Sequence, residues 1–167
     1  MSEAATPLTL QRLPLFPLQT ALFPGGWMPL RIFEVRYLDM IKRCHAAGAP
    51  FGVVCLSAGS EVRRADPAST DGFAPEALFD VGTLARIEQL ESPQPGLMLI
   101  HCRGQQRFHI NARHRLPHGL WVADVTLDEP ESVVAVPEHL ASTRDALQRV
   151  LANLREREPE DMNKLPL

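Results

Sequence analysis

A cluster of prolines near the start of the chain constrains its fold more than any other feature. Four prolines lie within the sixteen residues from Pro14 to Pro29. Because proline has no backbone N–H and breaks the interior of a helix, no helix can pass through this segment. We therefore predict two short strands within Leu8–Phe33, with a turn at Pro24–Gly26, where glycine accepts the positive φ of a reversal.

A short helix is predicted directly after these strands, over Glu34–Ala47. Its apolar residues recur every three to four positions, and Gly48 is expected to end it. The charged residues Arg31, Glu34 and Arg36 lie at the junction of strand and helix, so we expect a local ion pair there. The apolar positions of the helix are Leu38, Ile41 and Cys44.

Most of the chain that follows is strand-like. The β-branched content of Phe51–Leu56 predicts a buried strand, and the turn residues of Ser57–Glu76 predict a long loop. From Ala77 to Asp128, short strands follow one another and favour an antiparallel sheet that curls toward a barrel. Breaks between these strands are expected at Ser92–Gly96, Gly104 and Pro117–Gly119.

Alternation along these strands predicts which side chains share a face. The predicted fold class is α+β, with a mostly antiparallel curled sheet, one short helix after the second strand, and a helical part at the end. One face of an early strand is expected to carry Val81, Thr83, Ala85 and Ile87, and one face of a late strand Trp121, Ala123, Val125 and Leu127.

The last predicted helix, Pro137–Glu158, is amphipathic. Leu140, Leu147 and Leu154 are seven residues apart on an otherwise polar surface. An apolar stripe of this kind needs a partner surface. We therefore expect that the chain forms a homo-oligomer through this helix.

Composition limits the domain organisation and the partners of the chain. With 167 residues, 45% of them apolar, the chain can bury one core, which we assign to residues 8–128, with residues 129–167 as the helical part. A formal charge of −3 gives no overall attraction to nucleic acid. The sequence contains no export signal and no membrane span, and the three cysteines, being odd in number, favour a reducing cytoplasm.

The sequence contains no pattern that predicts nucleotide or acyl-transfer chemistry. No G-x-x-x-x-G-K-[ST] loop occurs, and no G-x-S-x-G elbow. The two lysines are Lys42, on the polar side of its helix, and Lys164, in the C-terminal tail, and neither suggests a serine-lysine pair. We expect no catalytic residue and no cofactor.

Four histidines within eighteen residues are the best candidates for a metal site, but their spacing argues against one. His114 and His118 are four apart, yet the proline between them makes a helical pair of ligands unfavourable. His101 and its neighbour Cys102 should point to opposite faces of a strand. We expect no metal here.

The same stretch is locally basic and provides the alternative function, RNA binding. Arg103, Arg107, Arg113 and Arg115 could contact phosphates, although Phe108 is the only aromatic residue among them that could stack on a base. A solvated rim of the barrel explains this segment better, so nucleic acid is not the expected partner.

Three aromatic residues near the first helix are the candidate site for a protein partner. Trp27, Phe33 and Tyr37 could form a docking patch, because aromatic side chains dominate recognition surfaces. In a small curved sheet, however, such aromatic residues more often belong to the core.

Four segments of the chain resemble the amino-terminal domain family of Lon proteases, in particular its free-standing bacterial members. The segment LPLFPLQTALFPGGWMPLRIFEVRYLDMI, Leu13–Ile41, resembles the opening of that domain. Three later segments resemble further elements of the family, in the family's order. They are FGVV at Phe51–Val54, FDVGTLARIEQL at Phe79–Leu90 and CRGQQRFHI at Cys102–Ile110.

The resemblance implies a β pseudo-barrel of the PUA type followed by a helical part. In Lon, this domain helps to select and hold protein substrates, whereas the ATPase and the serine-lysine peptidase are separate domains. The resemblance therefore implies a non-catalytic, cytoplasmic module of the substrate-recognition or adaptor type. Its expected partners are protein segments or unfolded proteins, and no catalytic residue is carried over.

Overall fold

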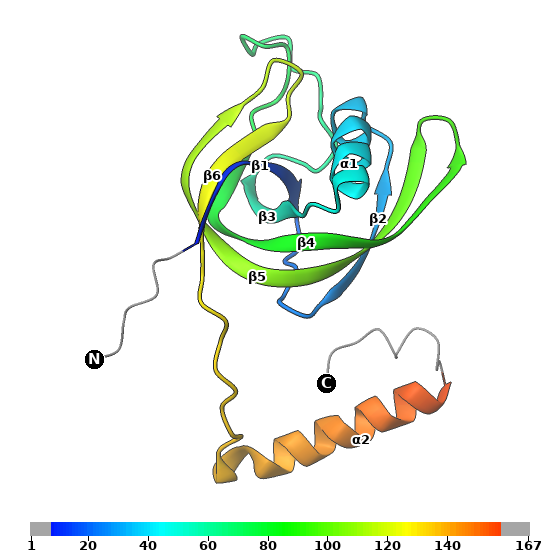
Figure 1. Ribbon diagram of the computed structural model, residues 1–167, viewed down its shortest axis with the longest axis vertical. Helices are drawn as coiled ribbons and strands as arrows, with labels where there is room; N and C mark the ends of the chain where they lie inside the picture. The colour runs from blue at the N-terminus through cyan, green and yellow to red at the C-terminus, as the bar shows by residue number, and fades with distance from the viewer. Residues whose placement is uncertain (1–7, 158–167) are drawn as a thin grey trace. The chain divides into compact units, whose positions relative to one another are not determined.

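The computed structural model describes residues 8–157 and divides after Glu129 into two compact units, each of which is described by itself. The first unit contains a curled sheet and one helix, and the second contains a helical segment (Figure 1). The strands are β1 (Thr9–Leu18), β2 (Trp27–Ile32), β3 (Phe51–Ala58), β4 (Ala77–Gln94), β5 (Leu97–Arg115) and β6 (Trp121–Leu127). The helices are α1 (Val35–Ala47), η1 (Glu138–Leu140) and α2 (Ala141–Arg157).

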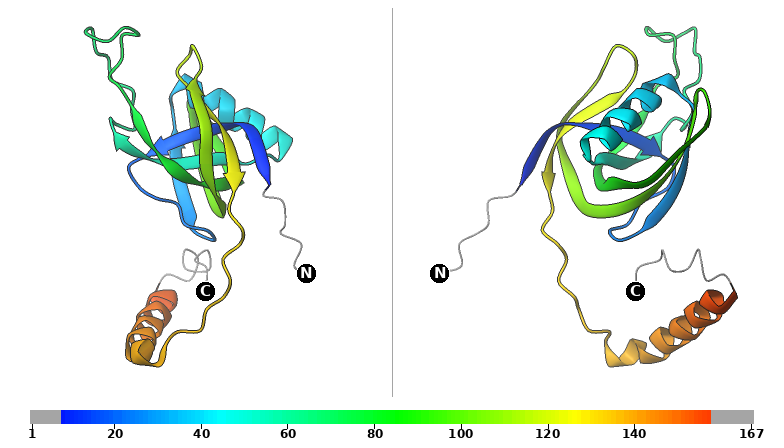
Figure 2. Two further views of the ribbon diagram at one scale, coloured as in Figure 1. Left: turned by 90° about the vertical axis from the view of Figure 1, so that its left-hand side faces the viewer. Right: turned by 45° about the vertical axis from the view of Figure 1, so that its right-hand side comes forward.

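The sheet closes on itself through β6. Its strand order is β2-β5-β4-β3-β1-β6, and β6 also pairs with β5, so the strands wrap around a common interior (Figure 2). Only the pairing of β1 with β3 is parallel among the described strands. The prediction of an α+β chain with a mostly antiparallel, curled sheet is confirmed. β2 pairs only with β5 among these strands, which leaves it at an edge of the sheet.

The prolines of β1 are accommodated because each half of the strand pairs on one side only. Thr9–Pro14 is paired with β6, whereas Leu15–Leu18 is paired with β3. No residue of β1 belongs to both pairings. The backbone nitrogen of a proline, which carries no N–H donor, can therefore face the unpaired side of the strand, and no ladder hydrogen bond is lost.

Two apolar clusters form the core of the first unit. One lies between α1 and the sheet and includes Tyr37, Ile41 and Phe51, and the other includes Phe108 and Val125. The helix ends at Gly48, with φ of 60°, as predicted. All members of both clusters lie between Leu10 and Leu127, so the core belongs to the first unit alone.

The predicted alternation holds for β6 and for the buried part of β4. Ala123, Val125 and Leu127 share the second cluster as expected. In β4, Ala85 and Ile87 pack in the first cluster and Leu84 packs in the second, whereas Val81 is 42% exposed. Both faces of β4 are covered at Leu84 and Ala85, so alternation there separates two apolar clusters.

The expected break at Gly104 is wrong, because β5 passes through it. The turn after β1 packs directly on this glycine: Gly104 N–H donates to Gly26 C=O at 2.8 Å, and Gly25 N–H donates to Gly104 C=O at 2.9 Å. A Cβ at Gly104 would collide with the carbonyl of Phe23. This glycine therefore allows close approach of two backbones rather than a turn.

The second unit carries the predicted amphipathic helix. Leu140, Leu147 and Leu154 are 44%, 57% and 44% exposed, and Val150 is 53% exposed. None of the described helices is long and apolar enough to cross a membrane.

Candidate functional site

Two cavities lie beside the middle of β2 and share Pro29, Leu30 and Arg31 in their linings. The first, about 280 Å³, is completed by the end of β1, the start of α1 and the loop after β3. The second, about 330 Å³, is completed by β4 and β5. We call the two cavities and their shared strand the β2 surface. Residues that line one cavity only include Phe16, Leu18, Phe33 and Val62 in the first and Gln89, Leu99 and His101 in the second.

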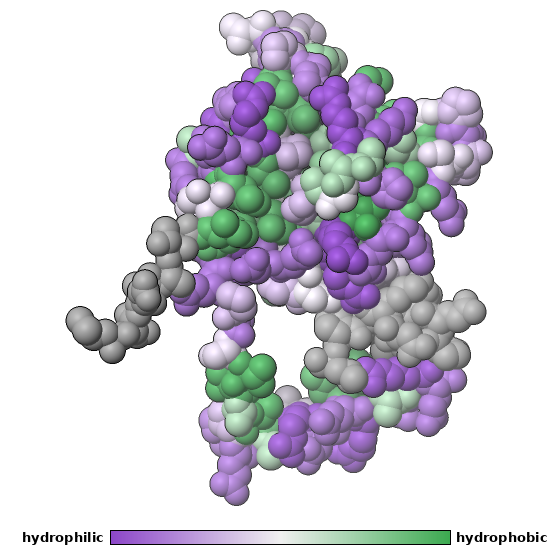
Figure 3. All heavy atoms as spheres, in the orientation of Figure 1, coloured by the Kyte–Doolittle hydropathy of each residue, from purple (hydrophilic) through white to green (hydrophobic). Residues whose placement is uncertain are grey.

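The β2 surface exposes large apolar side chains above a buried apolar floor. Phe33 and Val62 of the first cavity are 50% and 49% exposed, and Leu99 of the second is 38% exposed. Below them, Phe16 and Leu18 are buried in the core. Figure 3 shows that hydrophobic residues reach the surface of the barrel in patches among polar ones. Concave, mostly apolar sites of this kind bind ligands in many proteins.

The structure separates the three aromatic residues that the sequence suggested as a docking patch. Phe33 is at the rim of the first cavity, whereas Tyr37 is 3% exposed and forms part of its wall. Burial raises the pKa of Tyr37, so its hydroxyl stays neutral, and its ring lies 4.3 Å from that of Phe16. Trp27 stacks on His101, beside the second cavity, with ring centroids 4.6 Å apart.

Sequence reasoning missed two apolar residues of this surface. Val62 lies in the loop Ser57–Glu76, where polar and turn residues predominate. A large apolar residue among polar neighbours was the one feature of the sequence that pointed to it. Leu99 lies on β5 between two buried residues, Met98 and Ile100, so alternation predicts that it points outward.

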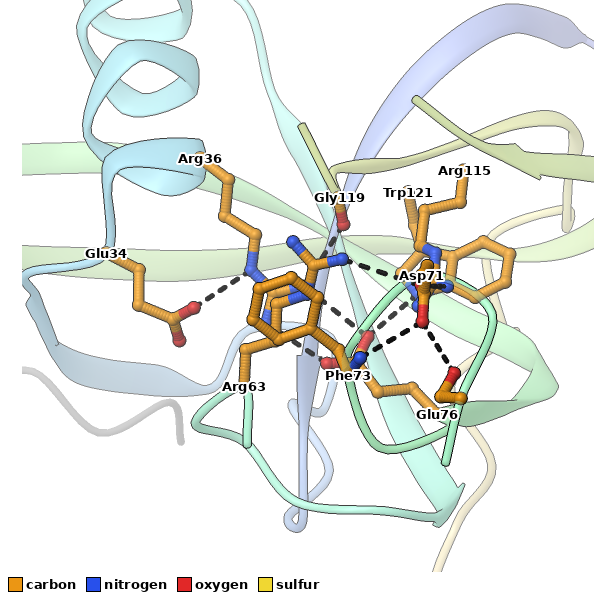
Figure 4. A network of polar contacts seen from close by, with 10 residues as sticks. Glu34, Arg36, Arg63, Asp71, Phe73, Glu76, Arg115, Gly119 and Trp121 are labelled. Atoms are coloured by element: carbon orange, nitrogen blue, oxygen red, sulfur yellow. Dashed lines mark hydrogen bonds and ion pairs between the residues drawn. The ribbon is translucent and has the colours of Figure 1, made fainter. Parts of the chain in front are cut away.

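The long loop that carries Val62 is tied to the barrel by a buried arginine (Figure 4). Arg36 donates to Glu34 at 3.0 Å, to Glu76 at 3.1 Å, and to the carbonyl of Gly119 at 3.0 Å. Burial alone lowers the pKa of Arg36, but the hydrogen bond to Glu76 and the nearby negative charges raise it overall. The predicted ion pair between Arg36 and Glu34 is confirmed, whereas Arg31 lies exposed on the β2 surface.

A second group of contacts anchors the tip of the same loop. The guanidinium of Arg63 lies 3.5 Å from the ring centroid of Phe73, and Asp71 pairs with both Arg63 and Arg115. The hydroxyl of Ser69 and the N–H of Phe73 donate to Asp71 and lower the pKa of its carboxyl group. These contacts hold the loop against β5.

Each arginine of the basic stretch on β5 faces a carboxylate. These pairs reduce the positive charge that β5 presents to a polyanion. The pairs are Arg103 with Glu88 at 3.3 Å, Arg107 with Asp128 at 3.6 Å, Arg113 with Asp80 at 2.9 Å, and Arg115 with Asp71.

Within residues 8–157, no three His, Cys, Asp or Glu side chains gather in a group that could hold a metal ion. Two histidines of β5 have protein partners: His109 lies 2.7 Å from Asp128, and His101 lies 2.7 Å from Gln89. Lys164, the second lysine considered above, lies outside the described residues.

Comparison with known proteins gives a match to a family model and matches to solved structures. A family model described as the ATP-dependent protease La (LON) substrate-binding domain matches residues 12–166. A Lon N-terminal domain protein from Xanthomonas campestris is 30% identical, with a TM-score of 0.60 over 89% of this chain and 73% of that one. The N-terminal domain of the Mycobacterium avium complex Lon protease shares the fold, with 21% identity and a TM-score of 0.53 over 93% of this chain and 76% of that one.

Proposed function

Because the chain belongs to the Lon substrate-binding domain family, we propose that it is a non-catalytic module that holds segments of other proteins on the β2 surface. The observation that carries this proposal is the pair of cavities on either side of Pro29–Arg31, with apolar side chains exposed at both rims. An extended segment points successive side chains in opposite directions, so it can fill two cavities that flank one strand.

The edge position of β2 supports the same proposal. β2 has a strand partner on one side only among the described strands, so an extended segment can also meet its backbone. Pro29 removes one donor from β2 and limits this pairing to a few hydrogen bonds. We expect side chains in the cavities to supply most of the affinity, which suits a module that accepts varied unfolded sequences.

Binding of a permanently unfolded protein tests the proposal. A fluorescently labelled, reduced and carboxymethylated protein is titrated with the chain and followed by anisotropy. Phe33→Asp combined with Val62→Asp is expected to weaken binding by about tenfold or more, as loss of central apolar contacts does in other interfaces. Phe79→Asp is the matched control, since Phe79 is 55% exposed on β4 and lines neither cavity. Absence of binding by the unaltered chain contradicts the proposal, as does equal loss in the control.

RNA binding through Arg103, Arg107, Arg113 and Arg115 is the alternative proposal, and we place it second because a carboxylate faces each guanidinium. The alternative requires affinity for single-stranded RNA that falls steeply with salt. It also requires that the affinity fall further in a variant with Arg107→Ala and Arg113→Ala. We expect neither result.

Self-association through α2 and a cytoplasmic adaptor role belong to the same proposal. The exposed Leu147 and Val150 would be covered by a second copy of the helix. Sedimentation of the unaltered chain is expected to show a dimer or larger species that Leu147→Asp dissociates. The cytoplasm remains the proposed location because Cys44, Cys55 and Cys102 are all free thiols.

A further inference from the structure

A larger cavity lies on another part of the barrel, between α1 and β6. Its volume is about 450 Å³, within the range of ligand sites, and it shares no lining residue with the β2 surface. Residues of β1, α1, the β5–β6 turn and β6 line it. We call it the α1–β6 cavity.

The α1–β6 cavity combines an apolar floor with a basic rim. Met40, Leu120 and Val122 are buried in the core cluster that packs against α1 and form part of the floor. Side chains from three separate parts of the chain stand exposed around it. The basic members of the rim are Arg12 of β1, Arg43 of α1 and His118 of the β5–β6 turn, and Asp39 of α1 is the acidic one.

Neither rim guanidinium has a counterion among the described residues, which is also true of Arg31, Arg64 and Arg86. Within residues 8–157, neither the side chain of Arg12 nor that of Arg43 makes a hydrogen bond or ion pair. The arginines of β5, such as Arg113, face a carboxylate instead. Two uncompensated guanidiniums beside an apolar floor favour a ligand that carries a negative charge next to an apolar group.

A β-bulge directs Arg12 into this position. The β1–β6 register shifts between Leu10 and Leu13, and Arg12 has a φ of 54°, the one positive φ of a non-glycine residue in the described part of the chain. Its backbone N–H donates to the carboxylate of Asp124 at 2.9 Å, which holds the bulge. Bulges commonly re-aim a side chain beside a functional site.

We infer that the α1–β6 cavity takes a large apolar side chain from a bound protein segment whose adjacent aspartate or glutamate pairs with Arg12 and Arg43. The inference rests on the proposed function, since it takes protein segments as the ligands. It adds a sequence preference, for acidic residues next to apolar ones, that the mostly apolar β2 surface does not supply. The guanidinium planes match the two oxygens of a carboxylate, and the floor accepts the neighbouring side chain.

Two end-blocked peptides that differ in one functional group test this preference. Both contain a leucine-phenylalanine pair, flanked by glutamates in one peptide and by glutamines in the other. We expect the full chain to bind the glutamate peptide about tenfold more tightly at low salt. The double variant Arg12→Gly and Arg43→Gln is expected to lose this preference while it still binds unfolded protein through the β2 surface. Lys42→Gln is the matched control, because it removes a neighbouring cation of α1 that does not line the cavity.

His118→Asp provides an independent variant on an exposed turn, and it should also abolish the preference by placing a carboxylate at the rim. Equal affinity for the two peptides overturns the inference, and so does a loss in Lys42→Gln as large as in the double variant. If dodecanoate binds the chain without displacing either peptide, the inference is also overturned, because the cavity then takes a small amphiphile and not a protein segment. The chain could bind the two peptides equally well, yet still bind unfolded protein and bind it more weakly after Phe33→Asp. In that case the proposed function holds and the further inference does not. If unfolded protein does not bind at all, the proposed function itself has failed.

Discussion

Arg36 and Glu76, forty residues apart in the sequence, meet in a buried two-pronged contact. Nη2 of Arg36 lies 3.1 Å from Oε1 of Glu76, and Nη1 lies 3.4 Å from Oε2. The Glu76 side chain is 4% exposed and also accepts a hydrogen bond from Trp121 at 3.0 Å. This contact fastens the end of the long loop to α1 and β6, and it thereby positions one wall of the β2 surface.

Glu76→Ala is expected to destabilise the chain strongly. It leaves the buried guanidinium of Arg36 with fewer partners and the indole N–H of Trp121 without its acceptor. Loss of one member of a buried pair typically lowers the free energy of unfolding by about 3 kcal/mol or more. Asp80→Ala is the control, since the 76% exposed side chain of Asp80 forms a surface pair with Arg113 worth less than about 1 kcal/mol. Urea denaturation measures both, and similar losses in the two variants would contradict the structural role of Glu76.

Gly104→Ala tests the close approach of the β1–β2 turn to β5. The new methyl group would collide with the Phe23 carbonyl group, whose carbon lies 3.1 Å from the place that a Cβ would take, so the turn must move. We expect a loss of about 2 kcal/mol in the free energy of unfolding, as for other overpacked sites. Gly96→Ala isolates the effect of backbone conformation, because Gly96 has a φ of +78° and open space around it, and it should cost only about 1 kcal/mol. A milder effect at Gly104 than at Gly96 would argue against the steric explanation.

Cys102 should make the stability of the chain depend on alkaline pH. Burial, with a smaller effect of Glu88, raises the pKa of this thiol to about 12. An unfolded thiol ionises near pH 8.5, so the stabilising contribution of Cys102 is complete below about pH 8.5 and is lost as the pH rises toward 12. The free energy of unfolding should therefore fall between pH 8.5 and 10 by up to about 1.4 kcal/mol per pH unit from this group. Cys102→Ala should show a shallower fall over the same range, and an unchanged slope would refute the assignment.

Arg12→Gly is expected to keep or raise the stability of the chain although it removes a charged side chain. Glycine adopts a φ near 54° without steric penalty, so the free energy of unfolding should rise by up to about 1 kcal/mol. Arg12→Val should lower it, because a β-branched residue is disfavoured at positive φ. Thermal melts of the two variants at one pH compare these effects, and greater stability of the valine variant would rule out a strained bulge.

A fragment that ends at Glu129 should fold on its own. The six strands and both apolar clusters lie before this residue. We expect a cooperative urea transition close to that of the full chain, with β-type circular dichroism. An unfolded fragment would show that residues 129–167 complete the core of residues 8–128, contrary to the proposed division into two domains.

The local pattern of the sequence was sufficient for the elements and the class of fold. The prolines of β1 and β2 exclude a helix, the spacing in α1 gives a helix up to Gly48, and the β-branched content of β3 gives a strand. These are short-range properties, since they depend on the backbone preferences of a residue and its neighbours in the chain. Phe33 of the candidate site was also accessible in this way, as an aromatic residue at a junction.

Contacts between segments distant in the chain decided the rest. Alternation did not show that both faces of β4 are covered, and Gly104 did not end a strand because a distant turn packs on it. The sequence by itself determined the helices, most of the strands and the family. Only the tertiary structure brought Arg12 and Arg43 to one cavity and Glu76 to Arg36, because closure of a barrel joins segments that are far apart in the sequence.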